Sequence, residues 1–318
     1  MWRLESRRGI YAVKELSADA DLSNEATVRH YETSEAIADA FAKRGILAIV
    51  ALKSADRFLN IVGESAYLVY PWCNAVAQDR RRVSERRGLN VARLLARMHG
   101  LKIDLGGAAE IEFELFPRGN VEDLLHRAGA CRVLGNRSLS DYQRDFRELI
   151  ESHDEALPVL KQKLLIGHGD LDQKNVLWDD RDDPVIIDWE SAGKLNPTYE
   201  IMLAALDWSG ITSEFNPDLF GKMIAAYQEA GGALQVDALQ ASVDYITGEW
   251  VIWLLYVVAL SLDETDPRQK EVEAEQIDFI LPTVLRLKKL KPDLVAMTET
   301  GQATSRTAAR ISRTGRLT

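Results

Sequence analysis

Apolar and polar positions alternate over the first sixteen residues and predict a β-hairpin. The predicted turn falls at Arg8-Gly9, and the two strands contain Trp2 to Leu4 and the run Ile10 to Val13. Lys14 ends the second strand. The hairpin is the predicted beginning of a small sheet.

The next stretch adds one helix and further strand candidates. Over residues 25–44, apolar side chains recur on one helical face, and Gly45 ends the predicted helix. Strands are predicted over residues 46–52 and 67–72, and Pro71 ends the second of them. This part of the chain therefore predicts a small sheet with one helix.

After residue 72 the pattern becomes mostly helical. Helices are predicted over residues 87–101, 120–128 and 139–163, and over most of 199–290. Two short strands interrupt them and are joined by an acidic turn: residues 175–178 and 184–188. We therefore predict an α+β fold with two lobes, which cover residues 1–72 and 73–297.

The end of the chain differs in composition from the rest. Residues 298–318 are rich in Ser, Thr, Arg and Gly and are predicted as a disordered tail. The whole chain has 318 residues, which is enough to bury roughly 75% of the surface that its unfolded form exposes. The length allows one large domain or two lobes.

Charge and cysteine content limit the classes of partner. The net charge of −10 argues against nucleic acid as the main partner, because phosphate binding requires a basic surface. An acidic protein suits a cationic substrate, although most acidic proteins are simply soluble. The two cysteines, Cys73 and Cys131, are too few for a disulfide framework or a zinc cluster and fit a reducing cytoplasm.

No segment predicts a membrane partner. The N-terminus lacks the apolar core of a signal peptide. The longest apolar run, Trp250 to Leu260, is far shorter than the ~20 residues that span a bilayer and predicts a buried helix. We therefore expect a cytoplasmic protein.

The strongest chemical signal is the run from His168 to Asn175, with Asp188 further along the chain. An Asp and an Asn five residues apart match the catalytic loop of kinases, in which the Asp accepts a hydroxyl proton and the Asn binds magnesium. Asp170 is therefore predicted as the catalytic base, and Asn175 and Asp188 as magnesium ligands. His168 is expected to hold the loop by hydrogen bonds.

A chance match is the alternative, and we expect one on the order of once per hundred chains of this length. The context favours function, because a strand, a turn and a second strand follow Asn175 and end at Asp188. Three further carboxylates could line the same cleft, although each alone is more typical of a surface or capping group: Glu190, Glu200 and Asp207.

Lys14 is predicted to contact the donor phosphates. It follows Tyr11-Ala12-Val13 on a strand, as in the Ala-x-Lys element of kinases, and the alternative is a solvated lysine at a strand end. Glu35 supports the functional interpretation, because kinases keep a glutamate on the packed helix to fix this lysine. Glu25 and Glu32 are competitors for that role.

The segment Tyr70-Pro71-Trp72 is predicted to link the lobes and to contact a nucleotide. Backbone groups of Tyr70 and Trp72 could form hydrogen bonds with the adenine edge, while Ala12 and Ile187 would enclose the ring. Ordinary core packing of Ala12 and Ile187 is compatible with that role.

Trp250, Trp253 and Tyr256 recur at a spacing of three and form a drifting aromatic stripe on a helix. Core packing is the favoured interpretation. The alternative is a wall of an acceptor pocket, in which Glu249 would contact a cation.

These motifs resemble the aminoglycoside phosphotransferase and choline kinase-like family, which has a two-lobed protein kinase-like fold. The resemblance spans roughly residues 10–290. Four segments carry it: the catalytic loop from His168 to Trp178, the metal-binding segment Ile187 to Glu190, Asn196 to Glu200, and Leu94 to His99.

The resemblance implies a small antiparallel-sheet N-lobe, a mostly helical C-lobe, and ATP with Mg²⁺ as the phosphoryl donor. The acceptor would be a hydroxyl of a small molecule, such as an aminoglycoside-like antibiotic, an amino alcohol or a sugar. Asp188-Trp189 replaces the Asp-Phe-Gly of protein kinases, and no Ala-Pro-Glu segment follows, which disfavours a protein kinase.

One departure concerns the first residues. Members of the family usually have a strand and a nucleotide-covering loop before the hairpin strand that carries the lysine. Only thirteen residues precede Lys14, and they contain no Gly-rich loop. The first strand is therefore expected to be missing by truncation, or the nucleotide is covered differently. The alternative function is a catalytically weak nucleotide-binding or regulatory protein.

Overall fold

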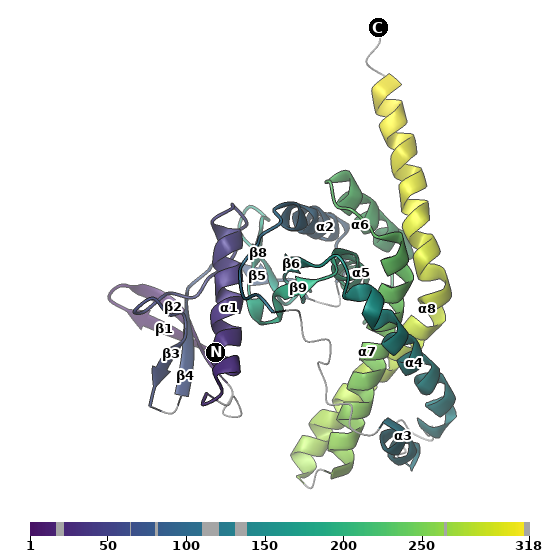
Figure 1. Ribbon diagram of the computed structural model, residues 1–318, viewed down its shortest axis with the longest axis horizontal. Coiled ribbons are helices and arrows are strands. Elements are labelled where there is room, and N and C mark those ends of the chain that lie inside the picture. The colour runs from purple at the N-terminus through teal and green to yellow at the C-terminus, as the bar shows by residue number, and fades with distance from the viewer. Residues whose placement is uncertain are drawn as a thin grey trace.

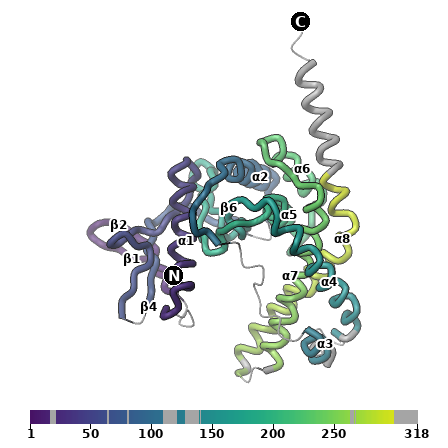
Figure 2. The backbone as a smooth tube through the Cα atoms, in the orientation of Figure 1, coloured from purple at the N-terminus to yellow at the C-terminus, as the bar shows by residue number. Residues whose placement is uncertain are grey.

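The computed structural model has a small sheet at one end and a group of helices at the other (Figure 1). Helix α1 (Glu25–Ala42) lies between these two parts, as the backbone trace also shows (Figure 2). The structure describes residues 1–16, 22–63, 65–79, 82–109, 121–130, 139–263 and 266–314. This arrangement confirms the predicted α+β class.

The N-terminal sheet is antiparallel, with the strand order β1-β2-β4-β3. Its strands are β1 (Trp2–Ser6), β2 (Gly9–Glu15), β3 (Asn60–Val62) and β4 (Ser65–Pro71). In the β2–β4 ladder Ala12 lies opposite Tyr70, and Lys14 lies opposite Leu68. Because alternate strand residues share a face, Ala12 and Lys14 lie on the same face as the fully buried Leu68.

Helix α1 begins where Asn24 caps it, since the Asn24 side chain accepts a hydrogen bond from the backbone N–H of Ala26. Ile37 and Phe41 are four residues apart on its buried face. Burying two side chains of this size contributes roughly 3–6 kcal/mol relative to leaving them exposed. This packing attaches α1 to the core and confirms the predicted helix.

Seven further helices form the larger part of the described structure. They are α2 (Glu85–Gly100), α3 (Val121–Ala130), α4 (Gln143–Leu160), α5 (Pro197–Trp208), α6 (Pro217–Glu229), α7 (Val236–Asp263) and α8 (Pro267–Thr314). Two short 3₁₀ helices accompany them, η1 (Leu139–Tyr142) before α4 and η2 (Trp189–Ser191). Their mutual packing buries the main hydrophobic core.

Short strands hold the loops of the larger part in place. They are β5 (Val76–Ala77), β6 (Leu165–Gly167), β7 (Val176–Trp178), β8 (Pro184–Ile186) and β9 (Gly193–Leu195), in sheets of order β5-β7-β8 and β6-β9. The run from His168 to Asn175 therefore lies between the end of β6 and the beginning of β7. The strands of this region confirm the two predicted before and after the acidic turn.

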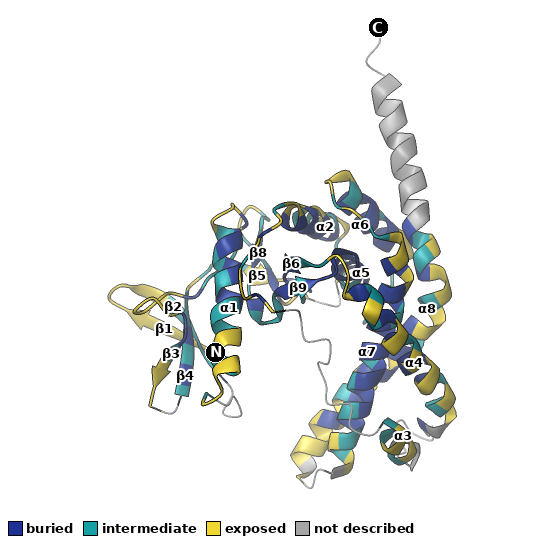
Figure 3. Ribbon diagram, in the orientation of Figure 1, coloured by how far each residue is buried: buried dark blue, intermediate teal, exposed yellow. Residues whose placement is uncertain are grey.

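Helix α7 is the one helix within the described ranges that is long and apolar enough to cross a membrane. In its most apolar window, 56% is buried inside the fold, and Figure 3 shows its buried part where α4, α5 and α8 pack around it. The core helix of a soluble protein passes the same test, so core packing explains the composition.

The segment predicted as a strand over residues 46–52 forms no strand. Instead it runs between the two parts of the fold: the N–H of Ile49 donates to Ile186 O of β8 at 2.9 Å, and the N–H of Leu52 donates to Val69 O of β4 at 2.7 Å. Its apolar residues are needed for packing against both neighbours, which explains the misleading pattern. Strand β3 was missed because it is short and largely exposed.

The predicted tail, residues 298–318, overlaps the last part of α8, which has helical backbone as far as Thr314. The segment contains no proline, and its alanines and arginines favour helix over irregular chain. Residues 315–318 lie outside the described residues. The predicted lobe boundary at residue 72 stays a prediction.

Candidate active site

The loop from His168 to Asn175 is fixed by a buried carboxylate. The N–H groups of His168 and Gly169 both donate to Glu200 Oε1, at 2.7 and 2.8 Å. Glu200 lies on α5 and is 1% exposed. Its second oxygen, Oε2, lies 2.7 Å from His99 Nε2 on α2. Glu200 is therefore neither a surface carboxylate nor part of the cleft wall, which corrects both sequence interpretations.

The surroundings of the Glu200 carboxylate lower its pKa and leave no space beside it for a side chain at Gly167. Burial raises the pKa of Glu200, but the hydrogen bond and charge of His99 and the N–H of Gly169 outweigh it and lower the pKa below its ordinary value. The other nitrogen of the ring, His99 Nδ1, lies 2.8 Å from the Tyr227 hydroxyl. A Cβ at Gly167 would lie 2.0 Å from Glu200 Oε2, so only glycine fits there.

The second half of the loop is held by the end of α5. Trp208 Nε1 donates to Leu171 O at 2.9 Å, and Gln173 Nε2 donates to Asp207 O at 2.6 Å. Asp172 Oδ1 accepts the backbone N–H of Lys174 at 2.8 Å. With both halves anchored, the loop presents its side chains in a fixed arrangement.

The structure brings Asp170 and Asn175 together, as predicted. Asn175 Nδ2 donates to the backbone oxygen of Asp170 at 2.8 Å and to Asp170 Oδ2 at 3.0 Å. Lys174 Nζ also lies 2.9 Å from Asp170 Oδ2. The Asp170 side chain is 35% exposed, so a carboxylate held by the loop remains accessible from outside.

Asp188 is adjacent to this pair through the backbone. The N–H of Ile187 donates to Asn175 O at 3.0 Å, and His168 Nε2 lies 3.0 Å from Ile187 O. Asp188 has a φ of 59°, in the left-handed region, which costs a non-glycine residue about 1–3 kcal/mol and occurs mainly at functional sites. Its side chain is 39% exposed.

These residues fit a magnesium ion. Both hydrogen bonds that the Asn175 amide forms with described residues use its Nδ2, and no described donor reaches its Oδ1, which leaves an oxygen for a metal. Asp188 supplies a carboxylate. Magnesium is usually held by one or two carboxylates together with substrate phosphates, so one carboxylate and one amide oxygen are a sufficient protein contribution.

The hairpin that joins the two metal-ligand candidates is anchored to α2. Arg87 Nη2 lies 2.7 Å from Asp182 Oδ1, and its guanidinium lies 4.7 Å from the centre of the Trp178 ring. Below the hairpin, the Trp189 ring stacks on Phe41 of α1 at 5.4 Å and lies 4.8 Å from the His168 ring. These contacts fix the positions of the predicted ligands on either side of the hairpin.

Lys14 reaches the same site from the N-terminal sheet. Its Nζ lies 3.1 Å from Asp188 Oδ1 and 2.6 Å from Glu190 Oε1. Burial lowers the pKa of the Lys14 ammonium, but the hydrogen bond with Glu190 and the charge of Asp188 outweigh it and raise the pKa. The predicted lysine therefore lies beside the predicted metal ligand, and Glu190, one of the three carboxylates expected as possible cleft residues, lies beside both.

Glu35 does not fix Lys14, contrary to the prediction. Its Oε1 accepts the Tyr70 hydroxyl at 2.7 Å, and its Oε2 accepts the N–H of Ala51 at 2.7 Å. These contacts tie α1 to β4 and to the segment of residues 46–52, and no hydrogen bond or ion pair joins Glu35 to Lys14 among the described residues. Among the competitors, Glu32 accepts the N–H of Leu59 at 2.9 Å.

The environment of Glu35 makes stability depend on pH. Burial raises the pKa of this carboxyl and outweighs the hydrogen bonds from Tyr70 and Ala51. A raised pKa means a stabilising contribution that is fully present below the ordinary value of 4.5 and is lost as pH rises through the folded-state pKa. Gln cannot titrate. We therefore expect the stability of Glu35→Gln to increase relative to that of the parent as pH rises through the folded-state pKa of Glu35. Urea unfolding across a pH series tests this, and a pH-independent difference would contradict it.

The predicted nucleotide contacts in the link have other partners. The N–H of Trp72 donates to Ile10 O at 3.1 Å, so it is engaged within the sheet and does not supply a free donor to adenine. The prediction for Tyr70 concerned its backbone, which lies opposite Ala12 in the β2–β4 ladder. Ala12 and Ile187 are both half-buried. Nucleotide contacts from these four residues stay predictions.

A second polar cluster lies on the side of α7. His153 Nε2 lies 2.7 Å from Glu249 Oε1, and the His153 ring stacks on Tyr245 at 4.3 Å. Burial and then the charges of Glu249 and Asp170 raise the pKa of the Tyr199 phenol. The aromatic stripe packs against the buried core of this region: Trp250, Trp253 and Tyr256.

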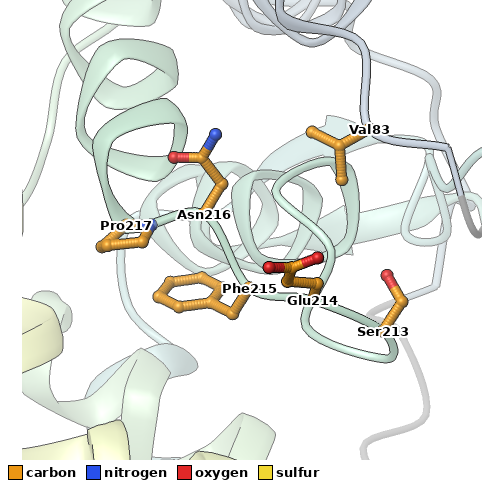
Figure 4. A pocket seen from close by; sticks show the side chains of 6 residues that line it. All are labelled: Val83, Ser213, Glu214, Phe215, Asn216 and Pro217. Atoms are coloured by element: carbon orange, nitrogen blue, oxygen red, sulfur yellow. The ribbon is translucent and has the colours of Figure 1, made fainter.

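A pocket of about 390 Å³ lies away from these residues, between the start of α2 and the loop from α5 to α6. Figure 4 shows its lining: Val83, Ser213, Glu214, Phe215, Asn216 and Pro217. None of the predicted site residues lines it, so it is separate from the convergent set around Asp170.

Comparison with known proteins adds independent information on the family. A model of the phosphotransferase enzyme family matches residues 19–239, which include the whole loop, Asp188 and Glu200. A search of curated proteins found no match.

Solved structures of small-molecule kinases share the fold over most of both chains. The choline kinase LicA of Streptococcus pneumoniae is 14% identical, with 89% of this chain and 88% of that chain covered and a TM-score of 0.55. An amicoumacin kinase, solved with AMP-PNP and Ca²⁺, is 13% identical (87% and 84% covered, TM-score 0.60).

A spectinomycin phosphotransferase, solved with ADP and spectinomycin, is 12% identical (94% and 88% covered, TM-score 0.57). At such low identity these likenesses show the fold alone. They confirm the predicted two-lobed protein kinase-like fold.

Proposed function

The chain belongs to the phosphotransferase enzyme family, and we propose that it transfers the γ-phosphoryl group of ATP to a hydroxyl of a small molecule. The observation that carries this proposal is the convergence of Asp170, Asn175, Asp188 and Lys14 from three separate parts of the sequence. Phosphoryl transfer requires positioning and charge neutralisation more than covalent chemistry, and these four groups supply both.

Each residue has a distinct task in this mechanism. Asp170 accepts a hydrogen bond from the acceptor hydroxyl, orients its oxygen toward the γ-phosphorus and takes its proton. Asn175 Oδ1 and Asp188 would hold Mg²⁺, which when bound neutralises charge on the donor phosphates. Lys14 adds a positive charge beside the same phosphates. Ala12, Ile187, Tyr70 and Trp72 belong to the proposed adenine side of the site.

The acceptor proposed here carries amino groups. The similar solved structures include kinases named for choline, amicoumacin and spectinomycin, and the net charge of −10 favours cationic small molecules. An enzyme that consumes ATP also fits the cytoplasm. ATP turnover with Mg²⁺, measured with and without a panel of amino sugars, amino alcohols and neutral sugars, tests the proposal.

A catalytically weak nucleotide-binding protein is the second candidate. The pairing of Lys14 with Asp188 and Glu190, rather than with Glu35, is the observation that favours it, because active kinases keep the lysine on a helix glutamate. Nucleotide binding without turnover on any acceptor would support this candidate.

The metal site gives a test that does not depend on the acceptor. We expect Asp188→Asn to remove most of the gain in ATP affinity that Mg²⁺ provides, by about tenfold or more, which corresponds to about 1.4 kcal/mol. The physical reason is the loss of the only carboxylate assigned to the ion. Isothermal titration with and without Mg²⁺ measures it, and Asp180→Asn in the exposed turn is the matched control. An unchanged Mg²⁺ response would remove Asp188 from the metal site.

A further inference from the structure

Lys174 precedes Asn175 in the loop and lies on Asp170. Its Nζ is 2.9 Å from Asp170 Oδ2 and 3.6 Å from Asp172 Oδ2. Half of the Lys174 side chain and about a third of the Asp170 side chain are exposed, so the pair lies at the surface of the loop. The mechanism above gives this cation no task.

The backbone of Lys174 is held by a hydrogen bond, and its side chain is paired with Asp170 and Asp172 at the surface of the loop. Its N–H donates to Asp172 Oδ1 at 2.8 Å, and its neighbours Gln173 and Asn175 are 4% and 2% exposed. The flexible stem of a lysine can therefore move its ammonium by several ångströms without moving the loop. Asp170 and the space around it remain within its reach.

The position of the acceptor follows from Asp170. A hydroxyl that gives its proton to Asp170 must lie roughly 2.6–3.2 Å from that carboxylate. The transferred phosphorus bonds to the hydroxyl oxygen, so it also comes within reach of an ammonium that begins 2.9 Å from Asp170 Oδ2. During transfer, negative charge is spread over the three equatorial oxygens of the phosphoryl group.

We propose that Lys174 is a catalytic residue that leaves Asp170 as the acceptor hydroxyl arrives and contacts the equatorial oxygens of the transferred phosphoryl group. The proposal rests on the proposed function. In the step, the bond from the acceptor oxygen to phosphorus forms and the bond from phosphorus to the ADP oxygen breaks. The hydroxyl proton goes to Asp170, and Lys174 transfers no proton.

The ordinary role for such a pair is a surface ion pair within one loop. An exposed ion pair contributes about 0–1 kcal/mol to stability and nothing to chemistry. The two roles differ in what removal of the cation changes: a surface pair affects folding slightly, whereas a catalytic cation affects the charge that develops on phosphorus.

The test uses the ADP–aluminium fluoride complex, which mimics the transferred group and needs no acceptor. Binding of MgADP is measured with and without aluminium fluoride for the parent, Lys174→Met, Lys174→Arg and the control Lys222→Met. Lys222 is another exposed lysine, paired with Glu85 and Asp218. Aluminium fluoride should increase the affinity of the parent for MgADP. We expect this increase to be about tenfold or more smaller in Lys174→Met, while the affinity for MgADP alone changes less than about threefold.

We expect Lys174→Arg to keep most of the increase in MgADP affinity that aluminium fluoride provides. Lys222→Met should show the same increase as the parent. An unchanged gain in Lys174→Met would overturn the role of Lys174 and leave the proposed function standing. A parent protein that binds MgADP equally with and without aluminium fluoride would overturn the proposed function together with this role. Once an acceptor is known, a lower kcat with an unchanged KM for ATP gives the same information.

Discussion

Replacing Asp170 with alanine should lower phosphoryl transfer by about 10²–10⁴-fold, the range expected for loss of a positioned general base. Affinity for MgATP should change less than about threefold, because the nucleotide is assigned to Lys14, Asn175 and Asp188. Initial rates and titration with MgATP measure the two quantities separately. A variant with full turnover would remove Asp170 from the mechanism.

Two companion variants make this result specific. Asp170→Asn keeps the size of the side chain and an oxygen that accepts the hydrogen bond from Asn175, so a similar loss of rate isolates the proton acceptor from the packing. Asp180→Ala removes an exposed carboxylate from the turn between β7 and β8 and should leave the rate unchanged. If the loss of any negative charge lowered the rate, Asp180→Ala would be slowed as well as the Asp170 variants.

Replacing Glu200 with alanine should destabilise the protein by about 3–5 kcal/mol and abolish transfer. The reason is the number of partners left behind: the N–H groups of His168 and Gly169 and the ring of His99 all lose a buried acceptor. Urea unfolding measures the loss. The control is Glu148→Ala, since Glu148 is exposed and its ion pair within the described residues is with the exposed Arg144, so its removal should cost less than about 1 kcal/mol.

Gly167 gives an independent check of the same contact. We expect Gly167→Ala to be severely destabilising in the parent protein, because its Cβ would overlap Glu200 Oε2. In the Glu200→Ala background the obstructing carboxylate is gone, so the second substitution should cost much less. Non-additivity of this kind is the signature of a direct contact. Strictly additive losses would show that the two residues act separately.

The convergence of Asp170, Asn175 and Asp188 was predictable because these residues are close in sequence and carry a fixed spacing. Asp170 and Asn175 lie on one loop, and the hairpin to Asp188 has a recognisable pattern of strands and turn. The terminal hairpin and α1 were predictable for a similar reason, since their apolar periodicities are local. Lys14 was predictable from the position at which the second strand of the hairpin ends.

The carboxylates were not predictable in this way, because their roles depend on distant partners. Glu200 binds backbone groups some thirty residues earlier and a histidine on another helix. Glu190 pairs with Lys14, the role predicted for Glu35, whereas Glu35 accepts hydrogen bonds from the Tyr70 hydroxyl and the N–H of Ala51. A carboxylate on a helix gives the same local signal in each case.

The segment of residues 46–52 has a mechanical consequence. Two described stretches connect the sheet with the helical part: this segment, bonded to both β4 and β8, and the link that follows β4 at Trp72. Helix α1 holds the two parts together as well, since Phe41 stacks on Trp189. A rotation of the sheet relative to the helical part would have to break the Lys14 contacts with Asp188 and Glu190, so these two ion pairs favour the arrangement described above.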